Sequence, residues 1–445
     1  MKQCETSPFN HPGLQWLAYE AGRAGLDLYL VGGCVRDYLR GKHCADYDLV
    51  SAQDPTPVAK LLARTFNGHW FWLDPQRRYS RVVLPSSVQF DFSPFRAPDL
   101  YADLSLRDFT INAMAVSLQG LGASAANQSV SVQIIDPLNG QRDLHQEQIH
   151  LCSATVLDDD PLRLLKGLRH CATMGFTLSS ATRQAAPAAA AQLHCIAPER
   201  IRAEIAGIFS APALEHLYYA LKNFNACRAH RALQLPTSSQ AYLDTHLLPA
   251  LEQAIARVDL CATSCPYIHE RLYWSAGDEF TFRSLGLLGI WLRVILHHSE
   301  TSFVADNTLK LSRKAATWLN WFLRCPEDIF LKLEQIEWRR YPRRALHLLS
   351  RNGAPLPHGL TALVFLASDM HAVAGLADLF QVCGTQVDQG RIKPLIEAAQ
   401  IQNRYSRMHG KALGECIKSL QHAEYRGEFS DTAGAWKWME EYQKG

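Results

Sequence analysis

Residues 28–50, LYLVGGCVRDYLRGKHCADYDLV, combine an apolar run, a glycine pair and two aspartates. The apolar run predicts a strand, and Gly32 and Gly33 predict a turn into a helix. The run ADYDLV predicts a second strand, which carries Asp46 and Asp48. On a strand, residues two apart project from the same face, so both carboxylates point the same way. The stretch therefore predicts a strand, a tight turn, a helix and a strand bearing paired carboxylates.

Two neighbouring carboxylates repel each other unless a cation neutralises them. Oxygen ligands of this kind suit Mg²⁺, which keeps several waters and binds substrate phosphates. The side-chain-free Gly32 and Gly33 let a phosphate approach backbone N–H groups, with Arg36 one turn further on. A paired aspartate motif or a glycine pair alone is usually a solvated edge or a simple turn. Their combination predicts a nucleoside triphosphate site with Mg²⁺ as cofactor.

Composition bounds the class of protein. The 445 residues are too many for one small core, so two to four domains are expected. The 45 basic and 43 acidic residues nearly balance, so nucleic-acid binding must come from local basic patches. The N-terminus lacks the apolar region of a signal peptide, and no apolar run is long enough to span a membrane. We expect a cytoplasmic protein with reduced cysteines and no membrane partner.

The pattern along the chain changes near residue 150. The earlier part alternates helical stretches with short runs rich in β-branched and aromatic residues, whereas the later part is almost entirely helical. The predicted fold class is an α/β head with a mixed sheet, followed by an all-α remainder. Its predicted segments are a head (1–145), a helical neck (146–225), a helical body (226–335) and a helical tail (336–445).

The motif G-G-x-V-R-D followed closely by D-x-D resembles the signature of a known family. This family comprises the class II tRNA nucleotidyltransferases and bacterial poly(A) polymerases, within the polymerase-β superfamily. The resemblance implies a polymerase-β-like nucleotidyltransferase head. It also implies that Asp46 and Asp48 bind the catalytic Mg²⁺ ions, and that Gly32, Gly33 and Arg36 contact the triphosphate.

A third carboxylate and a second motif extend the resemblance. The superfamily commonly adds an acidic residue from a neighbouring strand, and Asp91 in VQFDFSPF stands in that context. It would support the metals or help deprotonate the attacking 3′-hydroxyl; the alternative is a strand aspartate that faces water. LRDFTINAMA resembles the family's RRDFTxNA, with Leu106 in place of the first arginine. The matching residues, implied to bind the nucleotide, are Arg107, Asp108 and Asn112.

The stretch DDPLRLLKGLRHCATMGF resembles the family's EDxxRxxRxxRFxxxxGF. In that family the Asp and Arg hydrogen-bond the Watson–Crick edge of the incoming base, so no nucleic-acid template is needed. Asp160 and Arg163 match those positions, and Lys166 and Arg169 share a helical face with Arg163. The departures from the pattern are Asp159 for Glu, Lys166 for Arg and His170 for Phe.

Near residue 340, EWRRYPRRALHLLSRNG mixes arginines with aromatic residues, a composition that suits RNA backbone and stacked bases. The candidate RNA-binding residues are Arg339, Arg340, Arg343 and Arg344. A solvated helix end is the alternative. The resemblance implies that the helical segments hold the acceptor and TΨC arms of tRNA.

The connection APDLYADLSL between Arg96 and Arg107 is short. Family members that add only the two cytidines have lost a loop at this place. The resemblance therefore favours a CC-adding enzyme that uses CTP and acts with a separate A-adding enzyme. A full CCA-adding enzyme, which also uses ATP, is the alternative. A poly(A) polymerase and a catalytically inactive RNA-binding relative are less favoured, and nucleotidyltransferases that modify small molecules lack the helix that carries Arg163.

Overall fold

The computed structural model describes residues 8–119, 132–264, 266–297, 308–356, 358–367, 369–388 and 391–443. The chain forms two compact units. The first unit comprises residues 1–196 and 226–229, and the second comprises residues 197–225 and 230–445. This division does not test the four predicted segments, which stay a prediction. No helix in the described ranges is long and apolar enough to cross a membrane.

A six-stranded sheet with the order β3-β4-β5-β2-β1-β6 forms the centre of the first unit. Its strands are β1 (Leu28–Val31), β2 (Asp46–Ser51), β3 (His69–Asp74), β4 (Tyr79–Val83), β5 (Gln89–Pro94) and β6 (Ala115–Ser117). β2 and β5 are parallel, and the other neighbouring pairs are antiparallel. The predicted α/β head with a mixed sheet, followed by a helical remainder, is confirmed.

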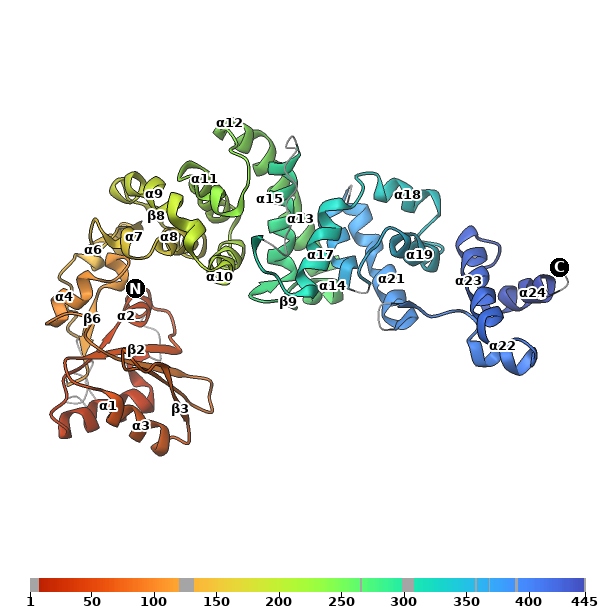
Figure 1. Cartoon of the computed structure of the whole chain (residues 1–445). Coiled ribbons are helices and arrows are strands. Elements are labelled where there is room, and N and C mark those ends of the chain that lie inside the picture. The colour runs from red at the N-terminus through yellow and green to blue at the C-terminus, as the bar shows by residue number, and fades with distance from the viewer. Residues whose placement is uncertain are drawn as a thin grey trace. The chain divides into compact units, whose positions relative to one another are not determined.

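One face of the sheet is buried because its strands alternate apolar and polar residues. On β5, Phe90 and Phe92 are buried, whereas Asp91 between them points to the other face. Helices α1 (Pro12–Arg23) and α3 (Thr56–Thr65) contribute apolar residues to the same core. Figure 1 shows both helices on one side of the sheet. The opposite face carries the polar side chains of β2, β4 and β5.

Further helices and short strands belong to the first unit. They are α2 (Gly33–Leu39), α4 (Leu100–Ser105), η2 (Thr110–Asn112), α6 (Gly140–His145), β7 (Gln148–Ile149), α7 (Val156–Asp159), α8 (Leu162–Met174), β8 (Thr177–Leu178), α9 (Ser180–Gln192) and η3 (Leu193–Cys195). β7 and β8 form a small parallel pair.

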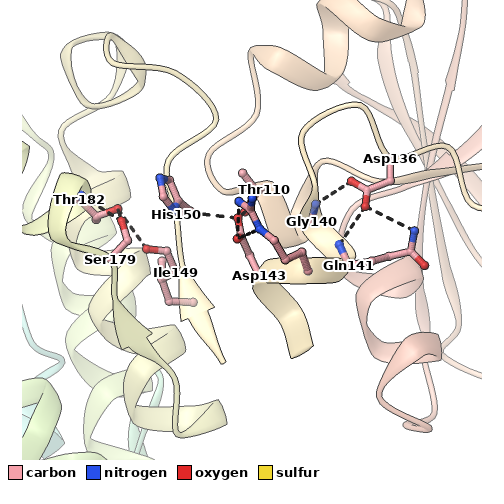
Figure 2. Close-up of polar contacts among 10 residues, drawn as sticks. Thr110, Asp136, Gly140, Gln141, Asp143, Ile149, His150, Ser179 and Thr182 are labelled. Atoms are coloured by element: carbon pink, nitrogen blue, oxygen red, sulfur yellow. Dashed lines mark hydrogen bonds and ion pairs between the residues drawn. The ribbon is translucent and has the colours of Figure 1, made fainter. Parts of the chain in front are cut away.

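Polar contacts fix the connection between η2 and α9, as Figure 2 shows. The Thr110 hydroxyl donates to Asp143 at 2.7 Å, and the backbone N–H of Gly140 donates to Asp136 at 2.6 Å. The Thr182 hydroxyl donates to the carbonyl of Ile149 at 3.0 Å. Because Asp143 is buried and hydrogen-bonded, this connection holds α6 against the segment that carries Arg107 and Asp108.

In its described residues, the second unit is helical apart from two short hairpins. Its longer elements are α10 (Pro198–Phe209), α11 (Leu214–Ala226), α13 (Leu248–Ser264), α14 (Pro266–Leu272), α15 (Phe282–Leu296), α17 (Arg313–Arg324), α18 (Ile329–Gln335), α19 (Pro342–Arg351), α20 (Thr361–Leu366), α21 (Met370–Gln386), α22 (Ala398–Arg404), α23 (Gly410–Arg426) and α24 (Thr432–Tyr442). Its short elements are η4 (Ala229–Leu233), α12 (Gln240–Tyr242), η5 (Leu243–Leu247), η6 (His358–Leu360), and the hairpin strands β9 (Ser275–Gly277), β10 (Phe280–Thr281), β11 (Val387–Asp388) and β12 (Arg391–Ile392).

Candidate active site

The glycine turn after β1 lies directly against the paired aspartates of β2. Asp46 and Asp48 are both exposed on the open face of the sheet, as their spacing predicts. Gly32 has φ 81° and ψ −143°, a conformation that is nearly exclusive to glycine. A Cβ at Gly32 would lie 2.8 Å from the Asp48 Oδ2 atom. The turn therefore needs glycine both for its backbone angles and for room beside the carboxylate.

Asp48 is a carboxylate whose charged form is disfavoured by its surroundings. Its carboxylate still reaches solvent, but the protein around it removes enough water to raise its pKa. Arg107 opposes this rise, while repulsion from Asp91 adds to it. An exposed carboxylate that is disfavoured in its charged form fits a position that a cation occupies during function.

Asp91 lies beside Asp48 and pairs with Arg81, a residue that none of the sequence motifs indicates. The two aspartates are register partners on the parallel strands β5 and β2. Arg81 of β4 pairs with both Asp91 oxygens at 2.7 Å, and this pairing raises the pKa of the guanidinium. Because Arg81 binds both Asp91 oxygens in this conformation, neither oxygen is free for the role predicted for Asp91. That role stays a prediction.

Among the described residues, the side chains that could hold Mg²⁺ are few. Within the described ranges, no group of three or more His, Cys, Asp or Glu side chains gathers to hold a metal. Asp46 and Asp48 offer two carboxylates on one face of β2. Mg²⁺ is usually bound through one or two carboxylates, with waters and substrate phosphates as its other ligands. The pair therefore fits Mg²⁺ together with a nucleotide rather than a metal bound by protein alone.

Arg36 and Asn112, from two different motifs, are in direct contact. Arg36 of α2 forms a two-point pair with Asp37 at 2.9 Å for both bonds. Its Nη1 atom also donates to the Asn112 side chain at 2.7 Å. A Cβ on Gly33 would lie 3.4 Å from Arg36. The predicted triphosphate contact is thus a largely buried arginine with a fixed orientation, 12% exposed.

The same chain of contacts continues to α8. The Asn112 amide donates to Asp108 at 3.0 Å, and Lys166 pairs with Asp108 at 2.6 Å. Burial alone would raise the pKa of Asp108, but Lys166 and Asn112 hold it well below its usual range. Four of the predicted nucleotide-binding residues therefore form one linked series from α2 to α8, in which Asp108 itself is buried.

The predicted base-selecting residues lie at the junction of α7 and α8. Asp160 directly follows α7, and its side chain accepts from the backbone N–H of Leu162 at 3.2 Å. Arg163 in the first turn of α8 donates to the carbonyls of Val156 and Leu106, both at 3.2 Å. Arg169 lies two turns further along the helix. The structure brings Arg163 to the segment that carries Arg107, where Leu106 replaces the usual arginine.

His170 stands where the family pattern has phenylalanine, and it behaves as an aromatic core residue. It is buried and packs edge-on against Phe109, with ring centroids 5.8 Å apart. Burial lowers the pKa of His170 well below its usual value; Arg169, Arg36 and Lys166 add to this effect and Asp108 opposes it. Its Nε2 atom is buried without a hydrogen-bond partner. The histidine in place of phenylalanine therefore puts a polar atom without a hydrogen-bond partner in the core.

Replacing His170 with phenylalanine is expected to raise the free energy of unfolding by about 1 kcal/mol at pH 8, because it removes an unsatisfied buried nitrogen. The gain should grow as the pH falls below about 6.5, where the unfolded histidine binds a proton and the folded one does not. Thermal unfolding between pH 5 and pH 8 measures this. His422→Phe, at an exposed position of α23, is the control. An equal difference between His170→Phe and wild type at both ends of the range would contradict the buried neutral histidine.

The predicted RNA-binding arginines have different environments. Arg340 has a side chain that is 72% exposed, and it lies over the ring of Tyr341 at 5.3 Å. Arg339 pairs with Glu334 at 2.7 Å. Arg344 lies 4.1 Å from the ring of Tyr341 and donates to the carbonyl of Gly427.

Arg343 has a structural environment instead. It is 13% exposed and pairs with the buried Glu424 of α23, which also accepts from His347 of the same helix as Arg343. Arg343 and His347 hold the pKa of Glu424 below its usual range, against the effect of burial. We expect Arg343 to join α19 to α23 rather than to bind RNA, while RNA binding stays a prediction for Arg340.

Sequence reasoning missed three charged residues of the site. Arg81 could have been found, because the short turn after β4 places it opposite Asp91 in an antiparallel pair. Asp37 is the last residue of the motif G-G-x-V-R-D, but the motif does not predict a role for it. Asp103 is buried and pairs with Arg96 at 3.1 Å and with Arg107 at 3.5 Å. No local pattern marks a buried aspartate inside a short helix such as α4.

The mixed sheet, the glycine turn against Asp48 and the helical remainder define an α/β head followed by helices. Residues 28–150 match the family described as Poly A polymerase head domain. Residues 175–229 match the family described as Probable RNA and SrmB-binding site of polymerase A. The predicted resemblance to tRNA nucleotidyltransferases and poly(A) polymerases is confirmed.

Curated relatives match less than half of the chain. A CC-adding tRNA nucleotidyltransferase of Geobacter sulfurreducens is 36% identical over 44% of this chain and 43% of its own length. An A-adding tRNA nucleotidyltransferase of Deinococcus radiodurans is 39% identical over 41% of this chain and 40% of its own length. A CCA-adding enzyme of Lactiplantibacillus plantarum is 33% identical over 41% and 44%. The chain therefore spans less than half the length of these relatives.

Solved structures share the fold over almost the whole chain. A CCA-adding enzyme in complex with CTP has a TM-score of 0.68 and 18% identity, covering 97% of this chain and 95% of its own. The Thermotoga maritima CCA-adding enzyme complexed with tRNA has a TM-score of 0.64 and 18% identity, covering 96% and 94%. These likenesses extend the shared fold to the helices beyond the matched sequence.

Proposed function

We propose that this protein is a Mg²⁺-dependent, template-independent tRNA nucleotidyltransferase that adds cytidines from CTP to the 3′ end of tRNA. One observation carries the proposal: Gly32 packs against Asp48, on a strand that also exposes Asp46. That contact puts a turn suited to phosphate beside carboxylates suited to Mg²⁺. The named activities of the relatives, all additions of nucleotides to tRNA, support the same reaction.

Each residue of the site has a role in this proposal. Asp46 and Asp48 would hold Mg²⁺, which when bound polarises the α-phosphate and stabilises the pyrophosphate leaving group. Arg107 lowers the pKa of Asp48 by its charge, so it lies near enough to bind a phosphate at the same place. Arg36 is oriented by Asp37 and Asn112 and holds the triphosphate through its remaining exposed edge. Asp91 aligns the attacking 3′-hydroxyl once its pairing with Arg81 is relaxed.

The junction of α7 and α8 is proposed to choose the base. Asp160 accepts and Arg163 donates, so together they can meet both kinds of group on the Watson–Crick edge of cytosine. Arg163 donates to two carbonyls of the surrounding backbone, which fixes the direction of its guanidinium. Lys166 is engaged by Asp108, so we assign it to support of this helix rather than to the base itself.

The preference for two cytidines is supported by the connection that replaces the family's loop. Residues Leu100–Ser105 form α4, whose first turn is capped by the Asp99 side chain. The buried Asp103 of this helix pairs with Arg96 and Arg107 at its two ends. A helix tied at both ends has little freedom to switch a site from CTP to ATP. We therefore favour CC addition, with a separate enzyme adding the terminal adenosine; a full CCA-adding enzyme is the alternative.

The helical segments are proposed to hold tRNA by shape and charge, at its acceptor and TΨC arms. A solved relative of the same fold is described in complex with tRNA, and another with CTP. The exposed Arg340 beside Tyr341 is the candidate contact in the second unit.

Primer extension tests the proposal. A tRNA lacking its CCA end and a second tRNA ending in CC are each incubated with Mg²⁺ and CTP, ATP or both, and products are resolved to one nucleotide. We expect addition of two cytidines and no further product when both nucleotides are present. A three-nucleotide product would identify a CCA-adding enzyme, a single adenosine on a CC-ended tRNA an A-adding enzyme, and a long adenosine ladder a poly(A) polymerase. Absence of any product with a folded, RNA-binding protein would contradict nucleotidyl transfer.

A further inference from the structure

The open face of the sheet continues from the aspartates to the edge strand β3. Register pairing joins Asp48 to Asp91, Asp91 to Arg81 and Arg81 to Phe71. Cross-strand partners project from the same face, so these four side chains form one row across four strands. The ring of Phe71 is 43% exposed at the end of that row.

A second row runs beside the first. It joins Asp46 to Gln89, Gln89 to Val83 and Val83 to the exposed His69. Along β3 the alternation is regular: His69, Phe71 and Leu73 are exposed, whereas Trp70 and Trp72 between them are partly covered. Edge strands usually carry charges on their exposed positions, but these three positions of β3 carry an imidazole, a phenyl ring and an aliphatic chain.

We propose that this row is the path of the RNA primer's 3′ end, with Phe71 as the surface on which one of its bases stacks. The inference rests on the proposed function, because it takes the reacting 3′-hydroxyl to lie at Asp48. Aromatic side chains on an open sheet are a common means of holding single-stranded RNA, since every base has a flat face to stack.

The spacing fits the last few nucleotides of a strand. Neighbouring strands lie about 4.8 Å apart, so the three steps from Asp48 to Phe71 span about 14 Å. Stacked nucleotides rise about 3.4 Å each, so about four rises separate the two ends and about the fifth nucleotide lies over Phe71, or an earlier one where the strand is extended.

Charge near the β3 end of the row agrees with an RNA occupant. The turn that follows β3 carries Arg77 and Arg78, whose side chains are 74% and 60% exposed; Arg78 pairs with Asp54 at 2.9 Å. Arg77 contacts Asp74 only at 3.8 Å, so its guanidinium can turn toward a phosphate. A protein strand added to the β3 edge would not need cations there, and it would not explain why the exposed ring lies in register with the aspartates.

The test compares Phe71→Ala, Phe71→Leu and Phe71→Trp with wild type in primer extension. We expect the alanine and leucine variants to raise the KM for the RNA primer about tenfold, as for the loss of one stacked base. The KM for CTP and kcat should change by less than about twofold, and the tryptophan variant should behave as wild type, because it keeps an aromatic surface. Tyr19→Ala, at a 63% exposed aromatic on α1, is the matched control on the covered side of the sheet and should change nothing.

Abasic substitution locates the stacked base. Removing one base at a time from the last five nucleotides should weaken wild-type binding at one position and leave Phe71→Ala insensitive there. Fluorescence anisotropy of the labelled RNA gives this affinity without turnover. If wild type binds RNA but adds no nucleotide, the proposed function fails while the affinity comparison still decides the role of Phe71.

Two results would overturn the inference. One is a primer affinity in Phe71→Ala equal to that of wild type. The other is a change of molecular mass in size-exclusion chromatography for Phe71→Ala with no change in primer affinity, which would make β3 a contact between copies of the chain.

Discussion

Asp48→Asn is expected to lower the rate of nucleotide addition by at least about a thousandfold. Asparagine keeps the shape of the side chain but removes the negative charge that would hold Mg²⁺, and such charge stabilisation contributes several kcal/mol to the transition state. Because each 1.4 kcal/mol is a factor of ten, a loss of this size follows directly. Single-turnover primer extension with saturating CTP measures it.

The same substitution should not destabilise the fold. Desolvation and the neighbouring Asp91 raise the pKa of Asp48, so its charged form is disfavoured in the folded protein without a cation. A neutral asparagine relieves that repulsion, and the melting temperature should stay equal or rise. Asp259→Asn, at an exposed position of α13, is the control and should keep full activity. A folded Asp48→Asn protein with more than about a tenth of wild-type activity would rule out Asp48 as the metal ligand.

The parts of the site that are close in sequence were predictable. The turn and the paired aspartates fall within one stretch of 28–50, and alternation fixes the face on which Asp46 and Asp48 project. The contact between the glycine turn and Asp48 follows from one further fact, the antiparallel pairing of β1 and β2. This pairing sets Val31 opposite Asp48. A short helical connection between two neighbouring strands is compatible with that pairing, but the sequence does not specify it.

Contacts between distant segments were not predictable. Arg36 meets Asn112 across 76 residues, and Arg343 meets Glu424 across 81 residues. The arginine pattern near residue 340 correctly indicates a basic helix with aromatic neighbours, yet one of its members faces inward because Glu424 of α23 is buried beside it. A basic stripe by itself does not say which of its charges has an internal partner.

Gly32→Ala is expected to destabilise the protein and to reduce its activity more than a hundredfold. The backbone at Gly32 costs an alanine about 1–3 kcal/mol, because its φ and ψ lie in a region that side chains avoid. The added methyl would also lie 2.8 Å from the Asp48 Oδ2 atom, well inside contact distance. The carboxylate must then rotate away from the position in which we propose that it holds Mg²⁺ together with Asp46.

Two other glycines separate strain from contact. Gly41 has φ 66° with open space around its Cβ position, so Gly41→Ala carries backbone strain alone. Gly22 lies within α1 and also has open space, so Gly22→Ala carries neither cost and should stabilise slightly. Unfolding by urea and the rate of nucleotide addition are measured for all three. If contact with Asp48 matters, Gly32→Ala loses far more activity than Gly41→Ala at a comparable loss of stability. Equal activity in the two variants would mean that the turn only shapes the backbone, and that Asp48 tolerates displacement.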